Sequence, residues 1–391
     1  MRVCILSQGR LEFTGGIESY VKSLSSWLST QNHDVILISR RLFGVKAANP
    51  QNNQISDNKV LRVPQTIYMI GLLILSIIAV LRVISENKKR KIDVIHGIVD
   101  FGYAGFAGIF ASKIIGAPLC ISLHSHRKFL LNRYLKSVSG RLMLTFDYAV
   151  EQLVYLKADV IIALSSNLKN YVGSFGIEPR KVIKIPVGIQ LDAFEEFDEA
   201  KEKSNRRHHW KNKMIIGYVG RLEREKNLFT LLQAFEEIVK RRQNTFLFLV
   251  GEGSLKNQLK TYAETTNVSK EVCFLGMQHN IPNWLQMFDV FILPSFTEGM
   301  PLALLEAMAA GKAIIASDIP AIREIVEDGK EACLFNPHNP KQLKDAILKL
   351  YNDPKLRKRF GENAKKKAKR YDVNEVFPKI LQVYQEISRT T

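Results

Sequence analysis

Two glutamates flank the start of a predicted helix in the run PSFTEGMPLALLEAMAAG, which begins at Pro294. Pro301 suits the first position of a helix and Gly311 the position after its end, so Glu298 lies in the preceding loop. Glu306 then lies about five residues, or ~7.5 Å, along the helix. A helix N-terminus binds phosphate and carboxylates accept hydrogen bonds from hydroxyl groups. If a phosphate group of a ligand binds at this helix N-terminus, the residues expected beside it are Gly299, Met300, Pro301 and Leu302.

Two cations follow another predicted strand, Met214–Val219, in the run GYVGRLEREKN. Arg221 provides a bidentate guanidinium and Lys226 a movable point charge, and together they suit a diphosphate group. The alternative for this loop is a solvated charged surface, which is our interpretation of Glu223, Arg224 and Glu225.

A glycine pair, Gly15 and Gly16, lies between the first predicted strand and a predicted helix. Adjacent glycines at a helix N-terminus let the backbone approach an anion closely. A tight turn without a ligand explains the same pair, and both interpretations stay open.

Short apolar runs alternate with amphipathic stretches along the chain, and the predicted strands and helices position these candidate residues. Such alternation indicates βαβ units and parallel sheets, an α/β fold whose ligands bind at the carboxyl ends of the strands. The rhythm breaks over residues 191–213, an acidic patch followed by a basic one. We therefore expect two doubly wound parallel-sheet domains, 1–190 and 214–370, joined by a linker at 191–213. The strands are expected at Val3–Ser7, Val35–Ser39, Val94–Ile98, Leu119–Leu123, Val160–Leu164, Val182–Pro186, Met214–Val219, Phe246–Val250, Cys273–Leu275, Val290–Leu293, Ala313–Ala316 and Ala332–Phe335.

The composition of the 391 residues is that of a globular protein, with 46% hydrophobic and 24% charged residues. The formal net charge is +18, and residues 1–190 hold 24 Lys and Arg against 11 Asp and Glu. This excess favours an anionic partner. The four cysteines lie in apolar runs without a C-x-x-C pair, which predicts reduced core thiols in a cytoplasmic protein.

An uncharged segment, Ile67–Leu81, is followed by the basic run Lys88–Lys91. Its 15 residues are short of the ~20 that cross a bilayer. The alternatives are a helix buried in the first domain, a membrane-spanning helix, and an interfacial helix beside a basic cluster. We favour the interfacial helix, with residues 67–91 bound to an anionic membrane surface.

These motifs together make the chain resemble the retaining glycosyltransferases of family 4, which have the GT-B fold of two Rossmann-like domains facing across a cleft. The resemblance rests on the Gly-Gly loop, the G-R-L-x-x-x-K-N run at Gly220, Gly251-Glu252-Gly253, and the E-x7-E element followed by AMAAGK. It implies transfer of a sugar from a nucleotide-sugar to an acceptor. The donor would bind the C-terminal domain and the acceptor the N-terminal one, onto which a terminal helix at 371–391 would pack back.

The resemblance also assigns roles by position. Arg221 and Lys226 would stabilise the leaving diphosphate, Glu298 would contact the donor sugar and Glu306 the ribose. Gly15 and Gly16 would offer backbone N–H groups to a phosphate or to the acceptor. His124, after a first-domain strand, matches the active-site histidine of the family. A metal pair of His124 and His126 is the alternative, but no third clustered ligand appears in the sequence.

The chain has no D-x-D motif, so we expect no metal and no cofactor, with protein cations at the leaving group instead. The family resemblance suggests front-side attack with retention, in which Glu298 orients the sugar and does not attack it. Two departures from the family pattern, Val187 and the segment Ser317–Ala321, weaken inferences about the hinge and the base of the donor.

The resemblance and the basic apolar segment together predict a hexosyltransferase that uses a UDP-sugar and a lipid-linked glycan acceptor at the inner membrane surface, in polysaccharide or glycolipid biosynthesis. It would be a cytoplasmic protein with peripheral or monotopic membrane association. The alternatives are a soluble transferase with a small acceptor, or a nucleotide-sugar epimerase of the same fold. A nucleic-acid partner is not expected, because the basic residues adjoin an apolar helix and do not alternate with aromatic ones.

Overall fold

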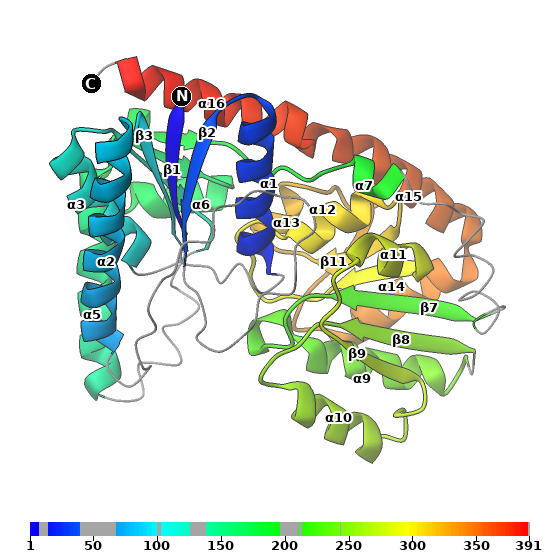
Figure 1. The fold of residues 1–391 in the computed structure, drawn as a ribbon. Helices are drawn as coiled ribbons and strands as arrows, with labels where there is room; N and C mark the ends of the chain where they lie inside the picture. The colour runs from blue at the N-terminus through cyan, green and yellow to red at the C-terminus, as the bar shows by residue number, and fades with distance from the viewer. Residues whose placement is uncertain are drawn as a thin grey trace. The chain divides into compact units, whose positions relative to one another are not determined.

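The computed structural model describes residues 1–7, 15–39, 68–99, 103–125, 138–195, 210, 213–242 and 244–389. The chain divides into two compact units. Unit 1 comprises Met1–Gly188 with Val373–Thr391, and unit 2 comprises Ile189–Asp372. Figure 1 shows a parallel sheet with helices around it in each unit.

The sheet of unit 1 has six parallel strands in the order β2-β1-β3-β4-β5-β6. Its strands are β1 (Arg2–Ser7), β2 (Asp34–Ile38), β3 (Val94–Val99), β4 (Leu119–Leu123), β5 (Val160–Ala163) and β6 (Val182–Lys184). Every residue of β1, β3, β4 and β5 is buried, because helices cover both faces of the sheet. This explains why these strands are continuous apolar runs without polar alternation.

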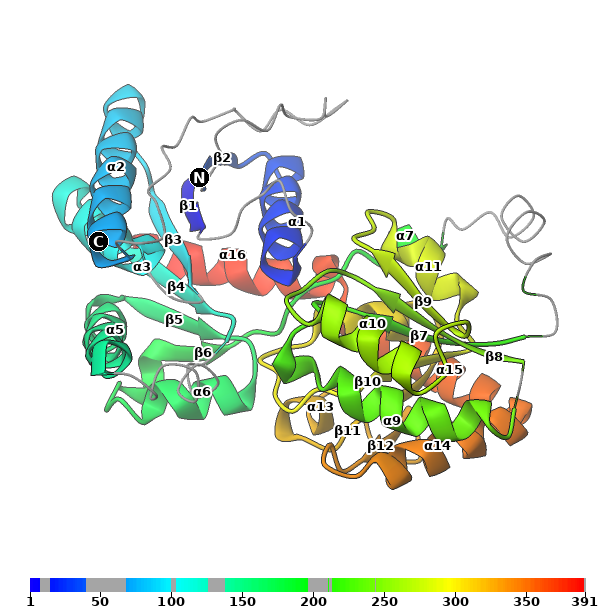
Figure 2. The same cartoon turned by 90° about the horizontal axis from the view of Figure 1, so that it is seen from below.

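The helices of unit 1 lie on both faces of this sheet. In the described ranges of this unit they are α1 (Gly16–Thr30), α2 (Tyr68–Lys89), α3 (Tyr103–Ile115), α5 (Val138–Lys157), α6 (Ser166–Gly173) and α16 (Val373–Arg389). Helices α2, α3 and α5 line one face, with α2 packed on α3 and α3 on α5, while α1 and α16 lie on the other (Figures 1 and 2).

Helix α16 brings the last residues of the chain back to the first sheet. Its buried side chains include Val376, Phe377, Ile380 and Tyr384. Phe377 contacts the Tyr20 ring edge-on, and the indole of Trp27 donates to Asn374 Oδ1 at 3.1 Å. Residues separated by most of the chain therefore share one core.

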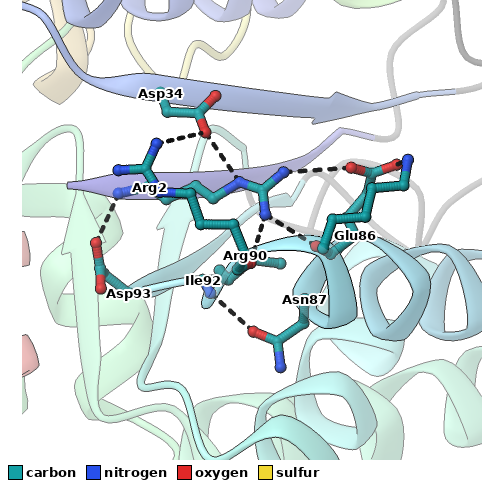
Figure 3. A network of polar contacts seen from close by, with 8 residues as sticks. Arg2, Asp34, Glu86, Asn87, Arg90, Ile92 and Asp93 are labelled. Carbon is teal, nitrogen blue, oxygen red and sulfur yellow. Dashed lines mark hydrogen bonds and ion pairs between the residues drawn. The ribbon is translucent and has the colours of Figure 1, made fainter.

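The N-terminal end of β1 is held by a buried arginine (Figure 3). Arg2 donates to the carbonyl oxygens of Glu86 and Arg90 at the C-terminal end of α2. It also pairs with the Glu86 carboxylate at 3.3 Å and with Asp34 at 3.0 Å. The guanidinium thereby satisfies carbonyl groups that a helix end leaves unpaired, and it fixes α2 to the sheet.

The sheet of unit 2 also has six parallel strands, in the order β12-β11-β10-β7-β8-β9. Its strands are β7 (Met214–Val219), β8 (Thr245–Val250), β9 (Val272–Gly276), β10 (Val290–Leu293), β11 (Ala313–Ser317) and β12 (Ala332–Phe335). The two sheets confirm the predicted α/β fold of two doubly wound domains, and all twelve expected strands are present with small shifts at their ends.

Most helices of unit 2 follow its strands in alternation. Within the described residues they are α7 (Asp192–Glu195), α9 (Leu228–Val239), α10 (Lys256–Thr265), α11 (Ile281–Met287), α12 (Leu302–Ala309), α13 (Pro320–Arg323), α14 (Pro340–Asn352) and α15 (Pro354–Ala368). Short 3₁₀ turns in the described part of the chain are η3 (Pro179–Lys181), η4 (Arg224–Lys226) and η5 (Lys369–Tyr371). Of the predicted linker, residues 196–209 and 211–212 lie outside the described residues.

The apolar segment Ile67–Leu81 corresponds to α2, although Ile67 itself lies outside the described residues. The helix is longer than the apolar run, because it continues through Arg82 and Glu86 to Lys89. One side of it is buried, while Ile77 and Leu81 are 59% and 61% exposed. The segment is therefore neither wholly buried nor a spanning helix: in the described part of the chain no helix is long and apolar enough to cross a membrane.

Candidate active site

A buried carboxylate lies at the carboxyl end of β10 in unit 2. Oε1 of Glu298 accepts hydrogen bonds from Lys226 Nζ at 2.7 Å and from Ser295 Oγ at 2.6 Å. The Lys226 and Glu298 side chains are only 16% and 8% exposed, so water screens this ion pair weakly. The structure thus brings together two residues that lie 72 positions apart and that the sequence analysis had selected separately.

Asn227 holds the Lys226 loop against the Glu298 loop. Its backbone is left-handed, with φ of 56°, a conformation that asparagine tolerates better than most residues. Its buried amide donates to the carbonyl oxygens of Pro294 at 3.0 Å and Pro337 at 2.7 Å. The loop that follows β7 is therefore tied to the loops that follow β10 and β12, which places Lys226 beside Glu298.

Glycines permit the loops after β7 and β8 to touch through their backbones. Gly251 has φ of 135°, and a Cβ on it would lie 2.0 Å from the carbonyl oxygen of Gly220. A Cβ on Gly253 would lie 2.3 Å from the carbonyl oxygen of Leu222. Any larger residue would push the Arg221 loop away, so these glycines position the cations.

Arg221 lies on the same loop but points to a different partner. Its guanidinium pairs with Glu225 at 2.7 Å, and its carbonyl accepts from Tyr218 Oη at 2.8 Å. The Arg221 side chain is 69% exposed, so its pair with Glu225 is weak and free to exchange for a ligand. The interpretation of Glu225 as a solvated side chain was wrong: it is 13% exposed and holds Arg221, because the 3₁₀ turn η4 directs it inward.

The N-terminus of α12 follows Glu298 directly. Pro301 is the residue before the helix and not its first residue as predicted, and no side chain caps the helix N-terminus. The first backbone N–H groups of α12 thus stay available to an anion. At the other end, Gly311 has φ of 65° and its N–H donates to Met308, which ends the helix as its sequence predicted.

Glu306 lies on α12, five positions into the helix. Its side chain is partly buried, and burial raises its pKa to about 7. Within the described ranges nothing donates a hydrogen bond to this carboxyl group. A partly buried carboxylate without a donor is stabilised strongly when a hydroxyl group of a ligand donates a hydrogen bond to it.

In unit 1, Gly15 and Gly16 begin α1, again without a side-chain cap. The carboxylate of Glu18 lies beside Gly15, since a Cβ on Gly15 would be 2.2 Å from Glu18 Oε2. The residues Gln8–Thr14 of the predicted loop lie outside the described residues.

His124 follows β4 in unit 1, and its backbone N–H donates to the Val99 carbonyl at 3.3 Å. The Tyr20 ring meets the imidazole edge-on, with 4.6 Å between centroids. Burial lowers the pKa of His124 to about 3, so the ring is neutral at pH 7. In the part of the chain described, no group is within hydrogen-bonding distance of its buried Nε2.

A second buried histidine lies behind His124. His96 Nε2 is 2.6 Å from Ser122 Oγ and its Nδ1 is 2.5 Å from Tyr384 Oη of α16. Burial lowers its pKa to about 3, with a further contribution from His124. Neither Ser295 nor this network was predicted from the sequence. Its place two residues after β10 is a signal for Ser295, whereas nothing in the sequence links His96 to Tyr384.

The residues described contain no cluster of three or more His, Cys, Asp or Glu that could hold a metal ion. His126, the second member of the H-x-H pair, lies outside them. Cys4, Cys120 and Cys333 are buried free thiols and Cys273 is partly buried, as their apolar runs indicate.

Sequence comparison assigns the chain to a family. Residues 14–193 match Glycosyltransferase Family 4, and residues 199–367 match Glycosyl transferases group 1. The two matches cover both units and include Gly15, Gly16, His124 and the whole unit 2 site. The chain is a family 4 glycosyltransferase.

Curated relatives of this glycosyltransferase have low sequence identity to it, but they align with most of its length. It is 24% identical over 79% of its length to alpha-D-kanosaminyltransferase of Streptomyces kanamyceticus, 82% of which is covered. It is 28% identical, over 69% of each chain, to UDP-Gal:alpha-D-GlcNAc-diphosphoundecaprenol alpha-1,3-galactosyltransferase of Escherichia coli. With alpha-monoglucosyldiacylglycerol synthase of Acholeplasma laidlawii it shares 25% identity over 97% of this chain and 95% of the relative.

Solved structures show the same fold. Sucrose-phosphate synthase from Thermosynechococcus elongatus matches with a TM-score of 0.84 at 19% identity, over the full length of both chains. Anabaena HepE in complex with UDP-glucose matches with a TM-score of 0.74 at 19% identity, over 99% of this chain and all of the other. The glycosyltransferase therefore has the GT-B fold that its motifs predicted.

Proposed function

We propose that this glycosyltransferase is a retaining, metal-independent hexosyltransferase that uses a UDP-sugar and a lipid-linked glycan acceptor at a membrane surface. The observation that carries the proposal is the Lys226–Glu298–Ser295 cluster, which directly precedes the uncapped N-terminus of α12. A cation, a carboxylate and an uncapped helix end lie close together in unit 2, which supports roles for them at the leaving diphosphate and the donor sugar.

The sugar donor is oriented by the hydrogen-bond donors and acceptors of this cluster that have no partner within the cluster. Lys226 has three N–H donors and uses one on Glu298, so the others are available to a diphosphate. Oε1 of Glu298 is occupied, and Oε2 accepts from a hydroxyl group of the sugar. Arg221 exchanges Glu225 for a phosphate oxygen, and Glu306 accepts from the ribose hydroxyls.

The UDP specificity rests on relatives. The structure of Anabaena HepE was solved with UDP-glucose, and the Escherichia coli relative is named for UDP-Gal. A GDP-sugar is the alternative donor. We also propose no metal requirement, because Arg221, Lys226 and the α12 N-terminus supply positive charge at the leaving group.

Retention follows from a front-side displacement. The bond between the anomeric carbon and the phosphate oxygen breaks, and the acceptor oxygen bonds to the same face of that carbon. The acceptor proton passes to the departing phosphate oxygen, which balances the charge. Glu298 is a poor nucleophile because Lys226 and Ser295 both stabilise its charge on Oε1.

The acceptor class is inferred from relatives and from residues 67–91. Two relatives are named for a diphosphoundecaprenol-linked substrate and for a diacylglycerol glycolipid. The exposed side of α2 and the basic residues that follow it suit a membrane surface, as the sequence analysis proposed. We accordingly place the enzyme on the inner face of a membrane, in polysaccharide or glycolipid assembly.

A donor screen tests the proposal. Purified enzyme is assayed for binding and slow hydrolysis of UDP- and GDP-linked sugars, with and without a lipid extract. Glu298→Ala and Lys226→Ala should abolish turnover, whereas Arg224→Ala, on the same loop with an exposed side chain, should not. The proposal is wrong if no donor binds even with lipid, and the lipid acceptor is wrong if only water-soluble acceptors are glycosylated.

Two further measurements test the mechanism. Activity retained in EDTA is expected, and strict dependence on Mg²⁺ would refute the metal-independent mechanism. Mass spectrometry of enzyme quenched during turnover should show no sugar on Glu298, since a covalent glycosyl adduct there would make this residue the nucleophile.

A further inference from the structure

Three neighbouring helices of unit 1 each expose apolar side chains. The apolar outer face consists of Ile77 and Leu81 on α2, Phe110 and Ile114 on α3, and Leu153 and Leu156 on α5. Exposure ranges from 38% for Leu153 to 61% for Leu81. The three helices are neighbours in one layer over the sheet (Figures 1 and 2), so their exposed sides point away from it together. Isolated exposed leucines are ordinary, but a set on three adjacent helices marks an interaction site.

Among the side chains that the structure describes on these helices, every exposed charged one is cationic. Exposed basic residues are Arg82, Lys88 and Lys89 on α2, Lys113 on α3 and Lys157 on α5. In a parallel αβ layer the helices run opposite to the strands, so Lys88, Lys89, Lys113 and Lys157 gather where β3, β4 and β5 begin. The result is an apolar surface with a basic border at one end.

The acidic residues of the same helices are turned inward. Glu86 is buried against Arg2 and Lys89, and Glu151 accepts from the hydroxyls of Tyr155 and Tyr171. Asp147 is buried as well. Glu86 offsets the charge of Lys89, with which it pairs at 2.8 Å, whereas Lys88, Lys113 and Lys157 pair with no carboxylate among the described side chains.

Arg2 makes the outer side of α2 a fixed feature. Its bonds to the carbonyl groups of Glu86 and Arg90 and to the Glu86 carboxylate lock the end of α2 onto β1 (Figure 3). Helix α2 also buries Ala79 and Val83. It therefore cannot turn Ile77 and Leu81 inward without breaking this network.

We infer that the apolar outer face and its lysine border together dock on an anionic lipid bilayer, with α3 and α5 contributing as much as α2. The leucine, isoleucine and phenylalanine side chains insert into the acyl boundary, and the lysines lie among anionic head groups. Charge decides between a bilayer and a protein partner. The exposed charged side chains described on α2, α3 and α5 are all cationic and outnumber the exposed Asp159 that follows α5, which matches an anionic phospholipid surface. The inference rests on the proposed function for its lipid-linked acceptor, and it extends the docking surface beyond residues 67–91.

Vesicle flotation of the full chain tests the inference. We expect binding to phosphatidylcholine–phosphatidylglycerol vesicles, weak binding to phosphatidylcholine alone, and loss of binding in high salt. Phe110→Ser with Leu156→Ser, which leaves α2 intact, should weaken binding about tenfold, as should Leu81→Ser with Ile77→Ser. Lys113→Ala with Lys157→Ala should weaken binding to the anionic vesicles only.

Matched controls come from unit 2. Met277→Ser removes an exposed apolar side chain there, and Lys240→Ala an exposed lysine, and neither should change flotation. Circular dichroism establishes that each variant is folded. The inference is refuted if the wild type does not float, or if the α3 and α5 variants bind like the wild type. It is also refuted if the outer-face variants convert a stable dimer to a monomer, since a second copy would then be the occupant.

Donor binding without lipid separates this inference from the proposed function. An enzyme that binds and hydrolyses a nucleotide-sugar but ignores vesicles would refute the docking surface alone. An enzyme that binds vesicles through all three helices but binds no donor would refute the proposed function alone.

Discussion

Single residues decide which atoms of the unit 2 site remain available to a ligand. Oε1 of Glu298 receives both Lys226 and Ser295, and the amide of Asn227 fixes the loop that carries Lys226. One oxygen of Glu298 and two donors of Lys226 are left for the substrate. The roles of these residues in turnover are predictions that follow from this distribution of hydrogen bonds.

Ser295→Ala tests the hydroxyl that shares Glu298 with Lys226. We expect about tenfold slower turnover with the donor found in the screen, because a hydrogen bond to a charged group is lost. Steady-state kinetics measure it. Ser254→Ala is the matched control, since Ser254 bonds to Glu223 on the neighbouring loop. Equal rates for both variants would show that Ser295 does not contribute.

We expect Glu306 to make donor binding depend on pH. Its raised pKa of about 7 means that the carboxyl group is mostly protonated at pH 6 and mostly ionised at pH 8. If the ionised form accepts from the ribose, affinity for the intact nucleotide-sugar should rise about tenfold over this range. Isothermal calorimetry measures it, and Glu306→Gln should abolish the dependence. A wild-type affinity that is flat or falls with pH would contradict the ribose contact.

At the scale of elements, helix α16 and the strands of unit 1 share a buried polar network. Tyr384 of α16 contacts His96 of β3, which contacts Ser122 of β4. Burial keeps His96 and His124 neutral, with pKa values of about 3. The network therefore links the last helix of the chain to the strand that precedes His124.

These histidines make unit 1 sensitive to acid. Unfolded histidine titrates near pH 6.5, so between about pH 6.5 and pH 3 the unfolded chain binds protons that the folded one excludes. The free energy of unfolding should be constant above pH 6.5 with respect to these groups. As the pH is lowered from 6.5 towards 3, it should decrease by ~1.4 kcal/mol per pH unit for each histidine. Amide hydrogen exchange of β3 and β4 measures it, and His96→Gln should reduce the slope by about half. An unchanged slope in this variant would contradict the assignment.

At the scale of the whole molecule, the chain forms two units, and unit 1 is completed by residues from both ends. Phe377 is fully buried in unit 1 against Tyr20 and Trp27. The predicted roles of the two domains, acceptor binding in the first and donor binding in the second, would give the two units separate tasks. The units can then be perturbed one at a time.

Phe377→Ala should destabilise unit 1 alone. Loss of a fully buried ring costs about 3–5 kcal/mol, and the cavity lies in the core of unit 1. Hydrogen exchange should accelerate in β1, β3 and β4 and stay unchanged in β7 and β8. Phe360→Ala, at a fully buried site of unit 2, should give the opposite pattern. Uniform acceleration in both units would mean that they unfold as one.

The sequence by itself determined the strands, their grouping into two parallel sheets, and the residues Lys226, Glu298 and Glu306 as site candidates. Those features are local, because apolar runs, glycine turns and helix ends act over a few residues. Only the tertiary structure decided that Ser295 and Lys226 share one oxygen of Glu298, that Glu225 holds Arg221, and that Tyr384 reaches His96. The Lys226–Glu298 and Tyr384–His96 contacts join residues 72 and 288 positions apart, and all of these contacts depend on side-chain direction, which residue spacing does not encode. The apolar outer face has the same origin, since its three helices become one surface only when the sheet aligns them.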